Sequence, residues 1–476
     1  MRDFARRALD VAQLRGATYA DIRIEDRRVE SISVKNGMVE ALATEESQGF
    51  GVRVIADGAW GFAASALLSG PEIDRVTAMA VDIARASALA KRADVNLGVA
   101  IVSRGAYCSQ YERDPFAVPL EEKIGLLLRA DAEMRRIEGV AVAEGSLECS
   151  RSLKSFASTE GSDVEQEIVE TGAGIVAMAV GDGEVQQRSY PNSFGRHQGT
   201  AGWEFVERMG LVENAARIAE EAVALLSAPQ CAPDVTTVII DATQMALQVH
   251  ESCGHAVELD RVLGMEAAYA GTSFLTPDKV GLQYGSQHVS IVADATAPHG
   301  LGTFGWDDEG VPAASTPLVQ NGRFVDYLSS RETASQFGKQ SNGTVRAQDW
   351  SCLPIIRMTN INLLPGQWSL DDLIADTDRG LFLSTNRSWS IDDKRLNFQF
   401  GTEIAWEIVG GKLGRMVKNP TYGAITPEFW NSCDAVCREW TMWGVVNCGK
   451  GQPSQAMHVG HGAAAARFRN LRVGIA

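Results

Sequence analysis

The sequence predicts an α+β protein in two parts: an α/β part with antiparallel strands and flanking helices, then a strand-rich part. In the first half, alternating polar and apolar residues and tight turns follow an amphipathic helix. Further segments with helical periodicity separate the strands there. Beyond residue 287, many short strands follow one another between turns, which is typical of a large antiparallel sheet or barrel.

Four segments of the first half have the spacing of apolar residues that favours a helix. They are 2–15, which Gly16 ends, then 72–90, 119–137 and 203–227. Asp131 interrupts the apolar face of the third segment. The helices therefore alternate with the strands of this half and can flank one sheet.

Strands are predicted from Tyr19 to about Ala66 and again between about 139 and 188. Asp21–Glu25 and Glu30–Lys35 alternate, and Asn36-Gly37 favours a hairpin turn. A second pair of strands is expected between Gly49 and Ala64. The other predicted turns are Asp57-Gly58, Gly161 and Gly181-Asp182-Gly183.

A proline-bounded connector, Ala228–Pro233, follows the fourth helix and indicates a domain boundary. We expect an N-terminal α/β domain at 1–230 and a C-terminal β-rich domain at 231–476. The second domain begins with a short buried strand at 235–240 and a helix at 243–253, with Asp241 or Thr243 as its N-cap. The later strands are expected at 289–292, 316–319, 324–327, 355–358, 380–383, 398–400 and 405–409.

Composition limits the classes of function. The net charge of −16 argues against a nucleic-acid partner, since phosphates require Lys and Arg. There is no apolar run of about 18 residues, so no membrane partner is expected. The N-terminus resembles an amphipathic helix instead of a signal peptide, which favours the cytoplasm. Eight scattered cysteines indicate thiols and no disulfide framework.

Two of the seven histidines lie in the stretch His250-Glu251-Ser252-Cys253-Gly254-His255. Two imidazoles and a carboxylate are the components of a hydrolytic metal site. Five residues on a regular α-helix rotate by about 500°, so the two rings would point about 140° apart. A helix that ends at Gly254, or one with a π-type bulge, can bring them together. A chance pair of helix and loop histidines is the alternative.

A catalytic zinc site needs a third protein ligand. Cys448 is the best candidate, because a thiolate suits zinc and neighbouring glycines allow a close approach of the backbone. Composition alone leaves Cys253, His288, Cys433, Cys437, His458 and His461 as competitors.

Other polar residues are candidate parts of the site. Glu258 and Asp260 are candidate acceptors for the ligand imidazoles. His458 and His461 are candidates for stabilising an oxyanion. By contrast, 307–309 and 300–305 favour a solvated turn and an ordinary loop over calcium or nucleotide sites.

The stretch 250–260 closely resembles the His-Glu-x-x-Gly-His-x-x-Glu signature of the TldD/PmbA family, in its TldD branch. Further resemblances, in the expected order, lie at 49–55, 307–312, 356–360, 386–390 and 447–453. The resemblance implies a metallopeptidase with His250, His255 and Cys448 as zinc ligands and Glu251 as the catalytic carboxylate. Iron is not excluded as the metal.

The same resemblance implies the partners. Family members are cytoplasmic and form dimers, so a homodimer or a heterodimer with a PmbA-type paralogue is expected. Their substrates are unfolded or flexible peptides, bound by strand addition to a sheet. Two alternatives are a zinc amidase or hydrolase that acts on a small peptide-like metabolite and a non-catalytic partner or regulator subunit.

Overall fold

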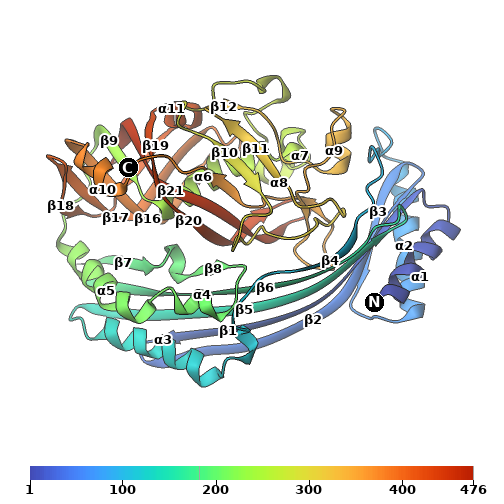
Figure 1. Cartoon of the computed structure of the whole chain (residues 1–476), viewed down its shortest axis with the longest axis horizontal. Coiled ribbons are helices and arrows are strands. Elements are labelled where there is room, and N and C mark those ends of the chain that lie inside the picture. The colour runs from blue at the N-terminus through green and yellow to red at the C-terminus, as the bar shows by residue number, and fades with distance from the viewer. Residues whose placement is uncertain (182, 475–476) are drawn as a thin grey trace.

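The protein is described here from a computed structural model that covers residues 1–181 and 183–474. The predicted turn residue Asp182 lies outside the described residues. The α+β class is confirmed. Figure 1 shows a long curved sheet, built from the first half of the chain, with the second half packed over one of its faces. The boundary predicted at 230/231 falls in the connection between α5 and β9 and stays a prediction.

The N-terminal sheet has the order β3-β2-β1-β5-β6-β4, and β7 and β8 also pair with β6. Only the β4–β6 pair is parallel. The strands are β1 (Tyr19–Lys35), β2 (Met38–Ala56), β3 (Ala59–Ser65), β4 (Arg104–Cys108), β5 (Val140–Ser158), β6 (Asp163–Gly181), β7 (Glu184–Tyr190) and β8 (His197–Gly199). The predicted hairpin at Asn36-Gly37 joins β1 to β2. The two alternating segments before it form one long strand, β1, and the exposed stretch after it begins a second long strand, β2.

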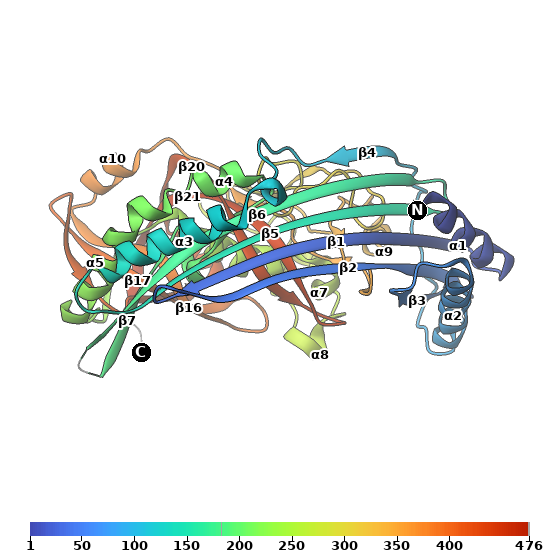
Figure 2. The same ribbon diagram turned by 90° about the horizontal axis from the view of Figure 1, so that it is seen from below.

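Helices cover one face of this sheet, as Figure 2 shows from below. They are α1 (Arg2–Leu14), α2 (Gly70–Ala88), α3 (Leu120–Arg135), α4 (Trp203–Glu207) and α5 (Leu211–Ser227). The apolar residues Ile22 and Ile24 of β1 pack under α1 and α2, and Ile32 and Val34 pack under α3 and α5. The single helix predicted at 203–227 is wrong. Gly210 adopts a left-handed conformation (φ 62°), so the segment forms two helices.

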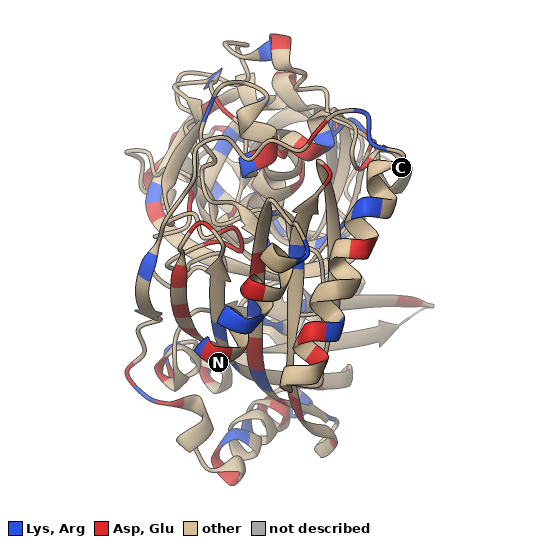
Figure 3. Ribbon diagram, turned by 90° about the vertical axis from the view of Figure 1, so that its right-hand side faces the viewer, with Lys and Arg blue, Asp and Glu red and all other residues tan. Residues whose placement is uncertain are grey.

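Acidic and basic residues are interspersed along the elements in Figure 3. One such pair joins the first two helices, since the Arg7 guanidinium lies 2.7 Å from the Asp74 carboxylate. Both side chains are exposed, so this ion pair contributes little to stability.

The opposite face of the sheet is polar and buried against the second half of the chain. The Arg23 guanidinium donates to the carbonyl oxygen of Cys352 at 2.6 Å. The Arg53 guanidinium lies 2.8 Å from Asp21 and 3.2 Å from Glu309. Ion pairs and hydrogen bonds therefore join the two halves, because the odd-numbered residues of β1 point away from the helices.

The second half contains a closed barrel of strands in the order β16-β9-β21-β19-β17, in which β17 returns to β16. These are β9 (Asp234–Ile240), β16 (Arg379–Ile391), β17 (Asn397–Val409), β19 (Thr421–Ile425) and β21 (Gln455–Val473). β18 (Lys412–Val417) pairs antiparallel with β17, and β20 (Cys433–Lys450) pairs with β21. The strands predicted at 398–400 and 405–409 are one strand. The β9–β16 pair is parallel, which the expectation of an antiparallel sheet did not include.

Smaller elements surround the barrel. One sheet has the order β12-β11-β10-β15, and β13 pairs with β14. These strands are β10 (Ile291–Asp294), β11 (Ser315–Gln320), β12 (Arg323–Phe324), β13 (Val345–Arg346), β14 (Ile355–Ile356) and β15 (Ile361–Leu363). The short helices are α7 (Leu259–Val262), α8 (Ala267–Ala270), α9 (Arg331–Ser335), α10 (Leu370–Ala375) and α11 (Thr426–Asn431). Among the described residues, no helix combines the length and apolar character needed to cross a membrane.

Candidate metal centre

The helix that carries both histidines changes its winding between them. α6 (Ala242–Val249) is capped by Asp241, whose carboxylate accepts from the backbone N–H of Gln244 at 3.0 Å. It continues as a π-helical turn, η3 (His250–Gly254), and a tighter turn, η4 (His255–Val257). The N–H of His255 donates to the carbonyl oxygen of His250, an i→i+5 hydrogen bond. Of the two geometries predicted for this helix, the structure has the π-type turn.

Gly254 is required here by packing and not by its backbone angles. Its φ is −51°, which any residue can adopt. A Cβ at this position would lie 2.3 Å from the sulfur of Met358. The absence of a side chain therefore lets the turn sit against Met358 and brings His255 onto the same side as His250.

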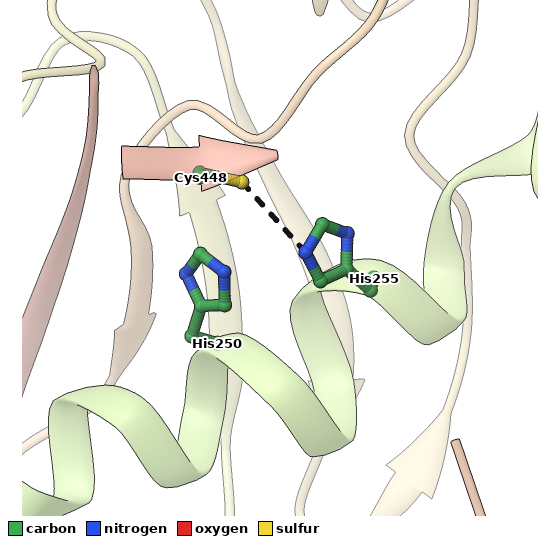
Figure 4. Close-up of side chains that lie close together, drawn as sticks. All are labelled: His250, His255 and Cys448. Carbon is green, nitrogen blue, oxygen red and sulfur yellow. Dashed lines mark hydrogen bonds between the residues drawn. The ribbon is translucent and has the colours of Figure 1, made fainter. Parts of the chain in front are cut away.

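The thiol of Cys448, on β20, completes a buried cluster with the two histidines (Figure 4). The candidate ligand atoms of His250, His255 and Cys448 all lie within 4.8 Å of one another. The Cys448 Sγ lies 3.7 Å from the Nε2 of His255. Among the described residues these three form a group that could hold a metal ion.

Hydrogen bonds fix which nitrogen of His250 is free. The Nδ1 of His461 lies 3.2 Å from the carbonyl oxygen of Ile361, which can only accept. Nδ1 of His461 must therefore carry the proton, and its Nε2 is an acceptor. The Nδ1–H of His250 donates to that Nε2 at 2.8 Å. The Nε2 of His250 is left with a lone pair for the cluster.

His255 is oriented by a carboxylate in the same way. Its Nδ1–H donates to the carboxylate of Glu258 at 2.9 Å. The Nζ of Lys450 lies 3.3 Å from Glu258 and 2.6 Å from Asp260. Glu258 thus contacts a candidate ligand imidazole, as predicted, while Asp260 contacts Lys450 and the backbone of Arg261 instead.

The electrostatic surroundings favour the protonation states that bind metals. Burial lowers the pKa of His250, and it lowers the pKa of His255 well below its ordinary value. Burial alone would raise the pKa of the Cys448 thiol, but His255 and Arg357 lower it, and the net pKa lies below the ordinary thiol value. Neutral imidazoles and a thiolate are the forms that coordinate a metal.

Glu251 lies at the wall of a cavity of about 420 Å³ that the cluster also lines. Its carboxylate forms an ion pair with the guanidinium of Arg395, which comes from the connection between β16 and β17. The opposite wall includes residues 444–449 of β20, and Asn192 and Arg196 line the side formed by the first half of the chain. The candidate site is therefore built by both halves of the chain.

The structure does not bring the other candidate ligands to the cluster. Cys253, Cys433 and Cys437 are buried elsewhere, and burial raises the pKa of each to about 12. His288 is exposed. His461 lies behind His250, and His458 lines a different cavity, so neither residue lines the cavity with Glu251. Arg395 was not predicted as a site residue. The sequence around it has no motif that indicates an ion pair with Glu251, which lies 144 positions away.

Sequence models of three family domains match the chain in order. They are described as PmbA/TldA metallopeptidase domain 1 at residues 20–84, central domain at 113–226 and C-terminal domain at 233–474. The fold and these matches define a metallopeptidase. The chain belongs to the PmbA/TldD family of metallopeptidases.

Individual proteins agree with this assignment. A metalloprotease of Methanothermobacter thermautotrophicus is 32% identical over 457 residues, covering 96% of this chain and 95% of that protein. A zinc metalloprotease TldD homolog of Saccharolobus solfataricus is 22% identical over 50% of this chain and 51% of its own length. Two crystal structures share the fold. A putative modulator of a DNA gyrase from Thermotoga maritima has a TM-score of 0.79 at 20% identity, over 99% and 100% of the two chains. TldE from Thermococcus kodakarensis has a TM-score of 0.73 at 17% identity, over 99% of each chain.

Proposed function

We propose that this chain is a zinc-dependent peptidase that hydrolyses unfolded or flexible peptides, with Glu251 as the general base. The observation that carries the proposal is the convergence of two imidazole nitrogens and a thiol beside a glutamate at one cavity wall. The zinc metalloprotease of S. solfataricus supports zinc as the ion. A cysteine ligand also favours zinc. Iron is the alternative ion.

His250, His255 and Cys448 would hold the ion. Their donor chemistry fits zinc, because each imidazole directs an unprotonated Nε2 and the cysteine a thiolate toward one point. Three protein ligands leave a further position for water or substrate. A bound zinc ion supplies Lewis acidity, which polarises a scissile carbonyl and makes water a nucleophile near neutral pH.

Glu251 is placed to move the protons of the reaction. Its carboxylate takes a proton from the attacking water and passes it to the leaving amine nitrogen. Arg395 holds the carboxylate at the cavity wall through the ion pair. An unsupported glutamate would have several rotamers, so this contact restricts the base to one orientation.

The cavity wall supports a peptide as the substrate. Among the named strands β20 pairs with β21, and an isolated bridge also joins its residue Cys437 to Trp368. The bridge lies outside residues 444–449, which line the cavity. An extended peptide can lie along the other side of this strand and form backbone hydrogen bonds, which requires an unfolded substrate. The cavity volume of about 420 Å³ also suits a small peptide-like metabolite, which makes an amidase the second candidate.

The likeness to TldE supports pairing with a PmbA-type paralogue, and a homodimer is the alternative. A cytoplasmic location is part of the same proposal and rests on the family resemblance. A non-catalytic regulator remains the third candidate function.

The test compares wild type with Glu251→Gln on a disordered protein and on short amides, with zinc measured in both. We expect wild type to degrade the disordered protein, and Glu251→Gln to bind stoichiometric zinc but to lose about 10²–10⁴ in rate. Preference for short amides would favour the amidase. Full activity of Glu251→Gln, or purification of both chains without metal, would refute the peptidase proposal.

A further inference from the structure

A second cavity, of about 250 Å³, lies between the N-terminal sheet and the second half of the chain. Val446 of β20 lines both this cavity and the one at the metal cluster. Glu251, His250, His255 and Cys448 line only the latter. The second cavity is therefore separate from the proposed catalytic residues, and its own side chains indicate what it binds.

One side of this cavity is formed by β1, β5 and β6 of the N-terminal sheet, and the register of these strands explains why space is left there. Glu25 and Arg27 of β1 lie opposite Lys154 and Ser152 of β5. Ser150 of β5 lies opposite Glu170 of β6, and Ser152 opposite Ile168. Small serines thus occupy the middle of the sheet side of the cavity, and long charged side chains surround them. The side formed by the second half of the chain is lined by residues 304, 306–308, 346–348 and 456–458.

Most charged side chains of this cavity already have polar partners. Asp307 accepts from backbone N–H groups, and Arg346 donates to backbone carbonyl oxygens. The Nζ of Lys154 lies 3.0 Å from Asp308, although Glu25 faces it across the sheet. The Nδ1 of His458 lies 2.6 Å from Glu170. These two contacts leave neither the Lys154 ammonium group nor the His458 imidazole available to Glu25.

Glu25 and Arg27 are the exceptions. Glu25 is 4% exposed, and its Oε1 accepts from the Ser152 hydroxyl at 2.7 Å, whereas its Oε2 has no hydrogen-bond partner. Among the described residues, no hydrogen bond or close ion pair engages the Arg27 guanidinium, whose charge acts on Glu170 at longer range and lowers the pKa of that carboxyl. A buried carboxylate without a cation is costly, so a ligand that supplies one is favoured.

We propose that this cavity binds a short zwitterionic peptide, with its ammonium group beside Glu25 and its carboxylate beside Arg27. Residues two apart on a strand are separated by about 7 Å, and an extended dipeptide spans about the same length. The volume lies below the range of about 300–1,000 Å³ for drug-sized ligands, which limits the ligand to two or three small residues. Such a peptide would be a product of hydrolysis at the metal cluster, and this role rests on the proposed peptidase function, whereas the binding itself does not.

The test is calorimetric titration of the full-length Glu251→Gln chain with dialanine, N-acetyl-dialanine and dialanine amide. Dialanine should bind, and blocking either terminus should weaken binding at least about tenfold, because each block removes one charge-assisted contact. Glu25→Gln should abolish the preference for the free ammonium group, and Arg27→Gln the preference for the free carboxylate. Asp26→Asn is the matched control, since Asp26 lies between them on the same strand and does not line the cavity.

A dissociation constant for dialanine above about 10 mM would overturn the proposal. Blocked peptides that bind as tightly as dialanine would also overturn it. So would Glu25→Gln and Arg27→Gln chains that bind the three peptides with the affinities of their parent. The blocked peptides test the idea on the parent chain, so a variant that fails to fold does not decide the result. Hydrolysis by wild type is measured separately, and a chain that binds dialanine without hydrolysing peptides would contradict the peptidase function alone.

Discussion

The Nδ1 of His250 lies 2.8 Å from the Nε2 of His461, and the Nδ1 of His461 lies 3.2 Å from the carbonyl oxygen of Ile361. This chain of two imidazoles and one carbonyl fixes the tautomers of both histidines. The sequence suggested an oxyanion role for His461, but its side chain is fully buried behind His250. Its contact with His250 makes it a positioning residue for a candidate metal ligand.

His461→Phe should lower zinc affinity by about 10–100-fold, because the His250 ring loses the acceptor that orients it. His461→Gln should retain more affinity, since an amide oxygen can accept from His250 while the amide N–H₂ donates to Ile361. Competition with a chromophoric chelator measures both values. Equal affinities for wild type and His461→Phe would show that the contact does not position His250.

Cys448→Ser should lose most of its bound metal, because a hydroxyl is a far poorer zinc ligand than a thiolate. Cys253→Ser is the matched control, since Cys253 is also buried and lies two residues from His255 but outside the cluster. Elemental analysis of the purified chains measures the metal content. If Cys448→Ser retained the wild-type content, Cys448 would not be the third ligand.

The sequence allowed much of the fold to be predicted where the signal is local. The Asn36-Gly37 hairpin follows from turn chemistry, and the helices α1 and α3 follow from helical periodicity. Their buried faces were predicted only in part, since Leu14 is exposed and Asp131 is buried. Residues 38–48 lie within the segment predicted to form strands, but their continuity with 49–56 in one long strand was not predicted, because a strand exposed on both faces has no alternation to detect. The break at Gly210 was missed because helical periodicity continues on both sides of it.

The candidate site was predictable only in part, for a related reason. The five-residue spacing limits the helix to an irregular geometry, and Gly254 marks where the irregularity is located. Contacts between segments that lie far apart in the sequence produce no local pattern that could be detected. His461 lies 211 residues from His250, and Cys448 lies 193 residues from His255. Cys448 was the best candidate from its residue type and neighbouring glycines, and the family resemblance separated it from its competitors, whereas Arg395, outside the resembling segments, was missed.

Gly254→Ala should destabilise the protein by about 1–3 kcal/mol, because its Cβ would overlap the sulfur of Met358 and force either side chain to move. Denaturant unfolding measures the change. Gly125→Ala, in the middle of α3, is the control and should be neutral or stabilising, because its Cβ meets only the mobile end of Arg129. Met358→Ala should cost less stability in the Gly254→Ala background than in wild type, because it removes the overlap. Unchanged stability of Gly254→Ala would show that the turn has room for a side chain.

Alkaline pH should destabilise the fold through its buried thiols. Burial raises the pKa of Cys433 from 9.0 to about 12, so the neutral thiol is retained in the folded state while the unfolded chain ionises. The stabilisation from this thiol is therefore complete below pH 9 and is lost as pH rises toward 12, at up to about 1.4 kcal/mol per pH unit.

Cys433→Ala should therefore show a shallower loss of unfolding free energy than wild type between pH 9 and about 11, although it is less stable at pH 7 because it leaves a cavity. Urea titrations at a series of pH values measure the difference between the two slopes. Cys108→Ala provides the comparison, since Cys108 is exposed and its removal should leave the slope closer to that of wild type. Identical slopes for wild type and Cys433→Ala would mean that the Cys433 thiol ionises equally in the folded and unfolded states.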